Sequence, residues 1–193
     1  MSASAVVIGA GVAGLTTAVC LAEAGMQVRV DAEQLPDETT SVAAGAMWDP
    51  YLVEPAHLVA RWSRETLWVL NKLSSVESTG IRLLEGTHES RTWCEMPSWG
   101  ELVEARLCSP AELRPGYVTG WRYRAPLVDM PQYLRYLTRR LARAGGCLRR
   151  HRYETLDEAL DQAPVLVNCS GVGARRLVPD SGIDAVRGEL VVV

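Results

Sequence analysis

Residues 5–15 constrain the fold more than any other part of the chain. They read A-V-V-I-G-A-G-V-A-G-L, a short apolar run followed directly by glycines at positions 9, 11 and 14. The run at 6–8 is typical of a buried strand, and Leu15, Ala18, Val19 and Ala22 recur at the spacing of one helical face. The pattern therefore predicts a strand, a tight glycine turn and a helix.

Each glycine of this turn has a role in binding a dinucleotide. Gly9 permits a sharp turn, Gly11 lets the backbone approach a pyrophosphate, and Gly14 lets the helix pack closely on the strand. The helix N-terminus then offers unpaired N–H groups to the phosphates. A second strand-like run at 27–30 completes a βαβ unit of the required length. A glycine-rich turn that binds no ligand is the alternative interpretation.

The acidic residue that usually contacts a ribose after the second strand is not at its expected position, which Ala32 occupies. Asp31 and Glu33 flank that position. Because strand alternation sends adjacent side chains to opposite faces, we expect one of the two to reach the ribose, and we favour Glu33. Asp31 is then expected to be an ordinary solvated carboxylate. No arginine directly follows this strand, which disfavours NADP.

Composition restricts the class of protein. The 193 residues are 48% hydrophobic and 22% charged, which is typical of a globular chain and not of a disordered or fibrous one. No window is as apolar as a membrane span and no signal peptide is evident, so we expect a cytoplasmic protein without a membrane partner. The five cysteines show no C-x-x-C spacing, so neither disulfides nor a metal site are expected. Cys20 and Cys169 are predicted to be buried.

The net charge of −3 argues against a nucleic-acid partner, although arginines crowd the segment that follows Pro131. Met130, Leu134, Leu137 and Leu141 predict the apolar face of a helix there. The basic residues opposite this face are expected to be solvated. These arginines stand at positions 135, 139, 140, 143, 149, 150 and 152.

The rest of the chain alternates helical patterns with extended runs. Apolar residues at helical spacing predict a helix over 59–73. Short strands are predicted at 81–85, 91–95 and 102–108, which suggests an antiparallel sheet inserted into the nucleotide-binding fold. Five aromatic residues of this region are expected to pack in a core: Trp93, Trp99, Tyr117, Trp121 and Tyr123.

A helix-like stretch at 155–162 leads into the apolar run 165–167, which Asn168, Cys169, Ser170 and Gly171 follow. Such a run is typical of a strand buried on both faces of a parallel sheet. A small polar residue and a glycine at the end of the strand open a crevice for a ligand. This is a second candidate contact with the dinucleotide, and a plain strand-to-turn junction is the alternative.

Residues 39–51, T-T-S-V-A-A-G-A-M-W-D-P-Y, are rich in small side chains, which suggests close approach to a flat ring system. Together with the glycine turn and the run V-N-C-S-G-V, they resemble the D-amino-acid oxidase family of FAD-dependent enzymes. The resemblance extends along essentially the whole chain. Further counterparts in the same order are S-P-A-E-L, G-W-R-Y, Y-L-R-Y-L-T-R-R-L and R-G-E-L-V-V-V.

The resemblance implies an α/β fold with a Rossmann-like FAD-binding βαβ unit and part of an inserted antiparallel β substrate domain. Residues 1–80 and 130–193 would form a discontinuous FAD-binding domain, and residues 81–129 would begin the substrate and interface sheet. The implied reaction moves a hydride from the α-carbon of a D-amino acid to FAD. Hydrolysis then yields a 2-oxo acid and ammonia, while molecular oxygen is reduced to hydrogen peroxide.

The resemblance also implies roles for single residues. Glu33 would hold the adenosine ribose, Tyr153 would lie near the adenine through its backbone, and Ser170 and Gly171 would lie at the flavin's crevice. Asp49 would line the substrate pocket and disfavour acidic substrates, leaving neutral or basic D-amino acids. The pyrophosphate would contact Gly9, Ala10, Gly11, Val12 and Gly14, and the diphosphate and isoalloxazine would contact Thr39, Thr40, Ala44, Gly45 and Met47.

Members of the family continue beyond the position that matches Val193, and the later part supplies the substrate-binding arginine and tyrosines, so no catalytic residue is assigned here. Residues 188–193 are predicted to be an apolar strand with no polar terminus to cover its edge. We therefore expect an amino-terminal portion that is incomplete relative to the family. A longer protein or a second polypeptide segment would complete the fold, and the isolated chain would have little oxidase activity. The expected assembly is a homodimer or completion by that second segment. The alternatives are a glycine-oxidase-like flavin amine oxidase and an inactive FAD- or NAD-binding fragment.

Overall fold

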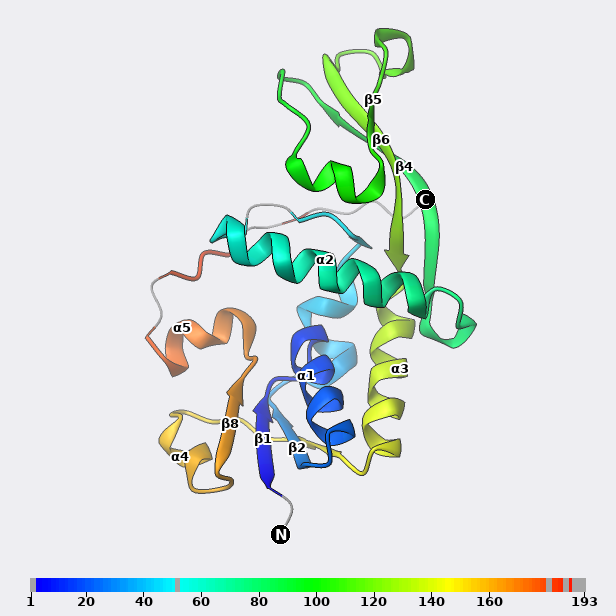
Figure 1. Cartoon of the computed structure of the whole chain (residues 1–193). Coiled ribbons are helices and arrows are strands. Elements are labelled where there is room, and N and C mark those ends of the chain that lie inside the picture. Colours follow the sequence, from blue (N-terminus) through cyan, green and yellow to red (C-terminus); the bar gives the residue numbers. More distant parts are fainter. Residues whose placement is uncertain (1–2, 51–52, 180–181, 186–187, 189–193) are drawn as a thin grey trace. The chain divides into compact units, whose positions relative to one another are not determined.

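The computed structural model describes residues 3–50, 53–179, 182–185 and 188, and it divides into two compact units (Figure 1). Unit 1 comprises Met1–Ala44 and Met130–Val193, and unit 2 comprises Gly45–Asp129. Residues 45–80 therefore cluster with the second unit, whereas the predicted domains grouped them with the first. The predicted strand over 188–193 lies outside the described residues, except for Gly188.

Unit 1 is built on a four-stranded parallel sheet in the order β7-β2-β1-β8. The two predicted strands of the βαβ unit are confirmed, and β1 is buried from Ala5 to Ile8 because it lies between two neighbours. The order brings the carboxyl ends of β2, β1 and β8 side by side, which is where open α/β sheets bind ligands. The strands are β1 (Ser4–Ile8), β2 (Gln27–Ala32), β7 (Cys147–Arg150) and β8 (Val165–Asn168).

Two amphipathic helices of unit 1, α1 (Val12–Glu23) and α3 (Met130–Arg143), pack against each other. The apolar faces predicted for both helices are confirmed, and Tyr133 adds to the buried face of α3. Arg140 of α3 donates hydrogen bonds of 2.6 and 2.8 Å to the carboxylate of Glu23 on α1. Two short helices, α4 (Asp157–Leu160) and α5 (Ala174–Leu177), complete the unit.

Three predictions about unit 1 are wrong. Cys20 is exposed, because it follows the buried position 19 and so turns away from the buried face of α1. In the described part of the chain β8 is an edge strand, so its side chains are exposed or half-buried instead of covered on both faces. Cys169 is half-buried instead of buried. The arginines expected to be solvated are exposed, apart from the half-buried Arg140, and four of the set also form ion pairs: Arg140, Arg149, Arg150 and Arg152.

Unit 2 contains the predicted antiparallel sheet, in the order β3-β6-β4, with β5 paired to β6. The helix predicted over 59–73 is α2 (Ala56–Leu73). The strands are β3 (Ala46–Met47), β4 (Ile81–Ser90), β5 (Arg106–Leu107) and β6 (Thr119–Val128). Short 3-10 turns in the two units are η1 (Pro36–Glu38), η2 (Thr40–Ala43), η3 (Glu77–Thr79), η4 (Ser98–Val103), η5 (Pro110–Glu112) and η6 (Gly171–Gly173).

The strand predictions for unit 2 were partly wrong. Residues 91–95 form no strand, and most of 102–108 is the turn η4 and loop, with β5 covering two residues. Strand β6 was not predicted, because its sequence T-G-W-R-Y-R-A-P-L-V contains a glycine and a proline. Pairing with β4 along all ten residues stabilises it despite those interruptions.

The aromatic residues of unit 2 are not all packed as expected. Trp121 and Tyr123 are buried on β6, and Trp99 packs edge-on against Tyr123 with the ring centroids 5.4 Å apart. Trp93, however, is 73% exposed, because it lies in the segment that does not form a strand. Among the described residues no helix has the length and apolar character needed to cross a membrane.

Candidate functional site

The glycine turn between β1 and α1 is packed too tightly for side chains. Gly9 has φ of +107°, and its N–H donates a 2.9 Å hydrogen bond to the carbonyl of Asp31. A Cβ on Gly9 would lie 2.3 Å from the carbonyl oxygen of Cys169, and one on Gly14 would lie 1.9 Å from the carbonyl oxygen of Gly9. The sharp turn and the close packing of helix on strand are therefore as the sequence predicted.

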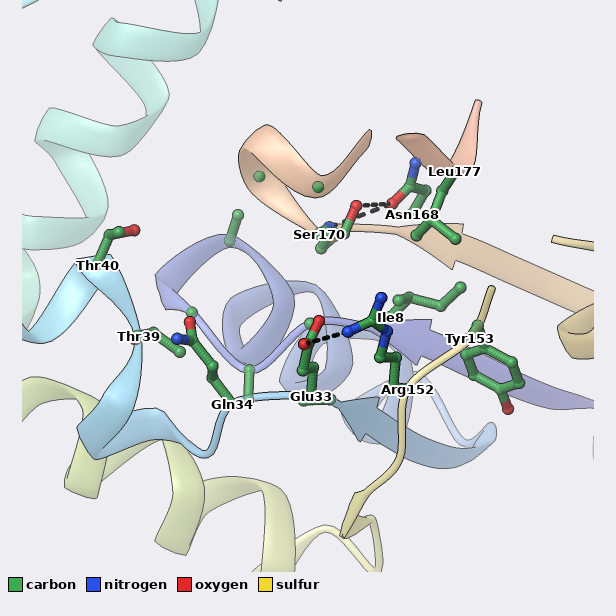
Figure 2. Close-up of a pocket in the computed structure, with 18 of the residues that line it drawn as sticks. Ile8, Glu33, Gln34, Thr39, Thr40, Arg152, Tyr153, Asn168, Ser170 and Leu177 are labelled. Carbon is green, nitrogen blue, oxygen red and sulfur yellow. Dashed lines mark hydrogen bonds and ion pairs between the residues drawn. The ribbon is translucent and has the colours of Figure 1, made fainter. Parts of the chain in front are cut away.

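A cavity of about 340 Å³ opens beside this turn at the carboxyl ends of β1, β2 and β8 (Figure 2). All the residues that line it belong to unit 1. The cavity thus lies at the edge of the sheet where a bound dinucleotide was expected. The lining comes from residues 8–13, 32–34, 39–41, 151–153, 168–171, 173, 176 and 177.

Most of the predicted cofactor residues meet at this cavity. Gly14 lies behind the turn instead, Ala44 is outside the lining, and Gly45, Met47 and Asp49 belong to unit 2. The binding roles of all these residues remain predictions. The predicted residues in the lining are Gly9, Ala10, Gly11, Val12, Glu33, Thr39, Thr40, Tyr153, Ser170 and Gly171.

The N-terminus of α1 borders the cavity and is suited to binding an anion. The first turn of the helix has no acidic residue, and Gly11 stands at its N-cap without a side chain. The N–H of Val12 donates a 3.0 Å hydrogen bond to Oγ of Ser41, which also lines the cavity. Free N–H groups and the helix dipole attract phosphate. Ser41 was missed as a candidate, although it directly follows Thr39 and Thr40.

Glu33 lines the cavity just past the end of β2, together with two guanidinium groups. Its Oε1 accepts a 3.0 Å hydrogen bond from Arg152, and its Oε2 lies 3.9 Å from Nη2 of Arg176. Figure 2 shows the contact between Glu33 and Arg152. Arg150 also donates to the main-chain carbonyl of Glu33 at 3.1 Å. Sequence reasoning missed Arg152 and Arg176 because tertiary folding alone brings them to β2.

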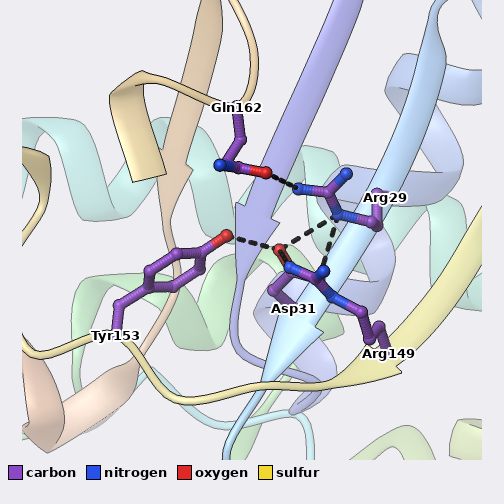
Figure 3. Close-up of polar contacts among 5 residues, drawn as sticks. All are labelled: Arg29, Asp31, Arg149, Tyr153 and Gln162. Atoms are coloured by element: carbon purple, nitrogen blue, oxygen red, sulfur yellow. Dashed lines mark hydrogen bonds and ion pairs between the residues drawn. The ribbon is translucent and has the colours of Figure 1, made fainter. Parts of the chain in front are cut away.

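The side chain of Asp31, predicted to be solvated, is fully buried. Its carboxylate accepts hydrogen bonds from the hydroxyl of Tyr153 at 2.6 Å, from Arg149 at 2.9 Å and from Arg29 at 3.1 Å (Figure 3). Arg29 in turn donates to Gln162 at 3.4 Å. We refer to these residues as the Asp31 cluster: Arg29, Asp31, Arg149, Tyr153 and Gln162.

Two opposing effects act on the pKa of Asp31. Burial by itself would raise that pKa, but hydrogen bonds from Arg149, Tyr153 and Arg29 outweigh burial and hold it below the ordinary value. Strand alternation does not separate Asp31 from Glu33, since residues two apart in a strand share a face. Asp31 and Glu33 are separated because β2 ends at Ala32, so Glu33 leaves the strand direction.

The end of β8 forms another wall of the cavity. Asn168 Oδ1 accepts hydrogen bonds from the N–H of Ser170 at 3.2 Å and from its hydroxyl at 2.7 Å. Gly171 follows with φ of +58°, a conformation that favours glycine. Cys169 is half-buried, and burial raises the pKa of its thiol.

In unit 2, Asp49 lies 3.7 Å from Nδ1 of His88, which stacks on Trp121 at 4.5 Å between centroids. Burial raises the pKa of Asp49, partly opposed by His88. Burial, together with the nearby Asp49 charge, raises the pKa of Tyr123 to about 12.

The residues of unit 1 fit the adenosine diphosphate part of FAD. Gly9 and Gly11 have no side chain of their own, and the nearest side-chain atom to a Cβ on Gly11 would be Oγ of Ser41, at 2.9 Å. The helix N-terminus and the carboxylate of Glu33 border the same cavity. The main-chain N–H groups at the helix N-terminus can donate hydrogen bonds to a pyrophosphate, and the carboxylate can accept them from ribose hydroxyls.

Comparisons with known proteins agree with this arrangement. The family described as FAD dependent oxidoreductase matches residues 4–193. The chain is 44% identical to a D-amino-acid oxidase of Rubrobacter xylanophilus over 98% of its length and 59% of that protein's length. It is also 44% identical to a D-amino-acid oxidase of Streptomyces coelicolor, over 97% of this chain and 58% of that protein. The chain thus spans less than two thirds of the curated relatives it matches.

A solved structure shows the same fold. Glycine oxidase from Geobacillus kaustophilus superposes with a TM-score of 0.68 over 92% of this chain and 58% of that one, at 17% sequence identity. At this identity the likeness concerns the fold alone.

Proposed function

The chain belongs to the FAD-dependent oxidoreductase family, and from this premise we propose that the protein carries out the oxidative deamination of D-amino acids. A D-amino acid, molecular oxygen and water would yield a 2-oxo acid, ammonia and hydrogen peroxide. The observation that carries the proposal is the cavity at the glycine turn in a chain that is 44% identical to two D-amino-acid oxidases.

FAD is the cofactor of the family, and when bound it supplies the acceptor for the electron pair of the substrate. In this proposal the main-chain N–H groups of the glycine turn and the start of α1 hold the pyrophosphate. Glu33 accepts hydrogen bonds from the adenosine ribose, and Ser170 and Gly171 border the flavin. Thr39, Thr40 and Ser41, which line the same cavity, contact the diphosphate.

We propose neutral or basic D-amino acids as substrates, on the basis of Asp49. Its half-buried carboxylate adjoins His88 and the aromatic residues of β6, and it would repel a second carboxylate on a substrate. A substrate ammonium or guanidinium group would be attracted by the same side chain. D-alanine, D-lysine and D-aspartate therefore form a graded set of test substrates.

The first experiment is a visible absorption spectrum of the purified protein. Flavin bands are expected, and their absence after incubation with FAD, together with binding of NAD, would contradict the proposal. In the completed protein, anaerobic addition of D-amino acids should then bleach the flavin bands, with D-lysine and D-alanine more effective than D-aspartate. Bleaching by glycine alone would instead indicate a glycine-oxidase-like amine oxidase.

The assembled form is also part of the proposal. We propose a homodimer, or completion by a second polypeptide segment, as the state that turns over substrate. Light scattering on the purified protein measures its mass, and a peroxide assay on the same fractions measures its activity. Full activity in monomeric fractions of this chain would contradict this part of the proposal.

A further inference from the structure

We propose that Asp31 is a positioning residue of the dinucleotide site, because its buried carboxylate holds the segment 151–153 that forms the cavity wall beside Glu33. Asp31 itself is not among the residues that line the cavity. The inference rests on the proposed FAD site and deepens it, since it assigns affinity for the adenosine half of the ligand to a residue behind the wall.

Asp31 connects two sides of the site. Its main-chain carbonyl accepts the 2.9 Å hydrogen bond from the N–H of Gly9, at the start of the glycine turn. In the sheet it pairs with Ile8 of β1 on one side and with Arg149 of β7 on the other. The backbone of Asp31 thus supports the pyrophosphate side of the cavity, while its side chain reaches the segment that follows β7.

Tyr153 is held in place by two kinds of contact. Its ring is buried with Val6, Ile8 and Ala159, and it packs edge-on against His151 with the centroids 4.5 Å apart. A hydroxyl buried next to such an apolar cluster needs an acceptor. The carboxylate of Asp31 is that acceptor, at 2.6 Å, so it determines which way the ring lies where Tyr153 meets the cavity.

Arg149 fixes the other end of the same segment. Its Nε and Nη2 each donate a 2.9 Å hydrogen bond to a different oxygen of Asp31, a bidentate contact that restricts the orientation of both groups. Arg29 donates to both oxygens at 3.1 Å from β2 itself. Because the pKa of Asp31 is held low, the carboxylate stays ionised and accepts all these donors near neutral pH.

The segment anchored in this way carries the charged lining of the cavity. The N–H of His151 donates a 2.9 Å hydrogen bond to the carbonyl of Ala32, and Arg152 contacts Glu33 at 3.0 Å. His151, Arg152 and Tyr153 all line the cavity. If the Asp31 cluster loosens, these three residues shift together, including Arg152, the partner of Glu33, while the glycine turn keeps its main-chain hydrogen bond.

The test separates the two halves of the ligand. Isothermal titration would measure ADP and inorganic pyrophosphate binding to the full chain and to the variants D31N, Y153F and E23Q. E23Q is the matched control, because it breaks an ion pair of the same unit, with Arg140, that lies outside the cavity lining. ADP contains the adenosine half of FAD, whereas pyrophosphate needs only the glycine turn and the helix N-terminus.

D31N is expected to weaken ADP binding about tenfold and Y153F about threefold, since each removes a charge-assisted hydrogen bond that orients the wall. Pyrophosphate binding should change by less than about twofold in both variants, and E23Q should change either ligand by less than about twofold. A purely structural role for Asp31 would lower the affinity for both ligands alike, and that result would overturn the inference.

The variants also distinguish this inference from the proposed function. Unchanged ADP affinity in folded D31N and Y153F, with a wild-type protein that binds FAD and ADP, would overturn the inference alone. A wild-type protein that binds neither FAD nor ADP would overturn the proposed function and the inference together. If D31N does not fold, Y153F decides, because it keeps the ion pairs of Asp31 with Arg29 and Arg149.

Discussion

Asp31 lies in β2 and Glu33 lies just past its end, yet the Asp31 cluster and the cavity rim, formed by Glu33, Arg152 and Arg176, are built in opposite ways. Asp31 is fully buried and accepts hydrogen bonds from three side chains at fixed geometry. Glu33 has a side chain that is 54% exposed and contacts arginines that are themselves about half exposed. The end of β2 at Ala32 is what separates the two environments.

From this difference we expect Asp31 to matter most for stability and Glu33 to matter most for ligand affinity. A buried, fully paired carboxylate contributes to the folding free energy and holds its neighbours rigid. An exposed ion pair contributes little to stability, so its partners can exchange a contact with each other for a contact with a ligand. Substitutions in the interior should therefore alter stability most, and substitutions at the rim should alter ligand affinity most.

The largest effect is expected for G14A, in the packed interior behind the glycine turn. The added Cβ would lie 1.9 Å from the carbonyl oxygen of Gly9, a backbone atom that cannot move without distorting the turn. We expect the free energy of unfolding to fall by about 3 kcal/mol or more. Urea denaturation followed by circular dichroism measures it.

G173A is the matched control for that experiment, because a Cβ at Gly173 would have its nearest neighbour at an ordinary 3.4 Å. Its free energy of unfolding should stay within about 0.5 kcal/mol of wild type. Equal losses of unfolding free energy in G14A and G173A would show that the glycine turn is not tightly packed.

The next largest effect is expected for D31N, whose partners Arg29 and Arg149 would lose their buried carboxylate. The free energy of unfolding should fall by about 3 kcal/mol near pH 7. Because folding lowers the pKa of Asp31, its contribution is present above the unfolded pKa and is lost as pH falls through the folded pKa. Wild type should thus lose stability below about pH 5, and D31N should lose less.

Urea denaturation from about pH 7 down to about pH 3 would measure this dependence. Stability curves of wild type and D31N that stay parallel over the whole range would contradict a low folded pKa for Asp31. They would also remove the contrast between the buried cluster and the rim.

E33Q should reverse the pattern seen for D31N. Glutamine keeps the size of the side chain but weakens the hydrogen bonds offered to ribose hydroxyls, so we expect FAD or ADP affinity to fall about tenfold. The free energy of unfolding should change by less than about 0.5 kcal/mol. Titration calorimetry measures the affinity and urea denaturation measures the stability of the same preparation. A large loss of stability with unchanged affinity would contradict the contrast between the exposed rim and the buried cluster.

The smallest effect is expected for R176Q. Arg176 lies 3.9 Å from Glu33, and both side chains are at least half exposed. The free energy of unfolding should change by less than about 0.5 kcal/mol, since exposed pairs at this distance are screened by water. ADP affinity measured at low and at high salt would show whether the guanidinium adds attraction for phosphate, and a stability loss as large as that of D31N would contradict an exposed rim.

Prediction from sequence succeeded where the pattern was local and repeated. The strand at 6–8 and the buried helix positions from Leu15 to Ala22 follow from hydrophobic spacing, which depends on residues only a few positions apart. The three glycines were interpreted correctly because the conformation and packing they permit are properties of the residue itself. Most of the predicted cofactor residues accordingly line one cavity.

Prediction failed where distant residues decide the environment. Strand β6 exists because β4 pairs along its whole length, and neither its glycine nor its proline indicated this. The burial of Asp31 depends on Arg149 and Tyr153, which are more than a hundred residues away in the sequence. Arg152 and Arg176 reach Glu33 from elements that share no local pattern with β2.

The sequence by itself determined the glycine turn, the strand and helix that flank it, and the family to which the chain belongs, because these depend on residue type and short-range spacing. The tertiary structure alone decided which of the two carboxylates, Asp31 or Glu33, faces the cavity and which is buried. That choice depends on where the strand ends and on the charges that other elements bring to it. Burial and ion pairing are properties of the assembled fold, so the two carboxylates on either side of Ala32 have different environments: Asp31 is buried and Glu33 is half-exposed.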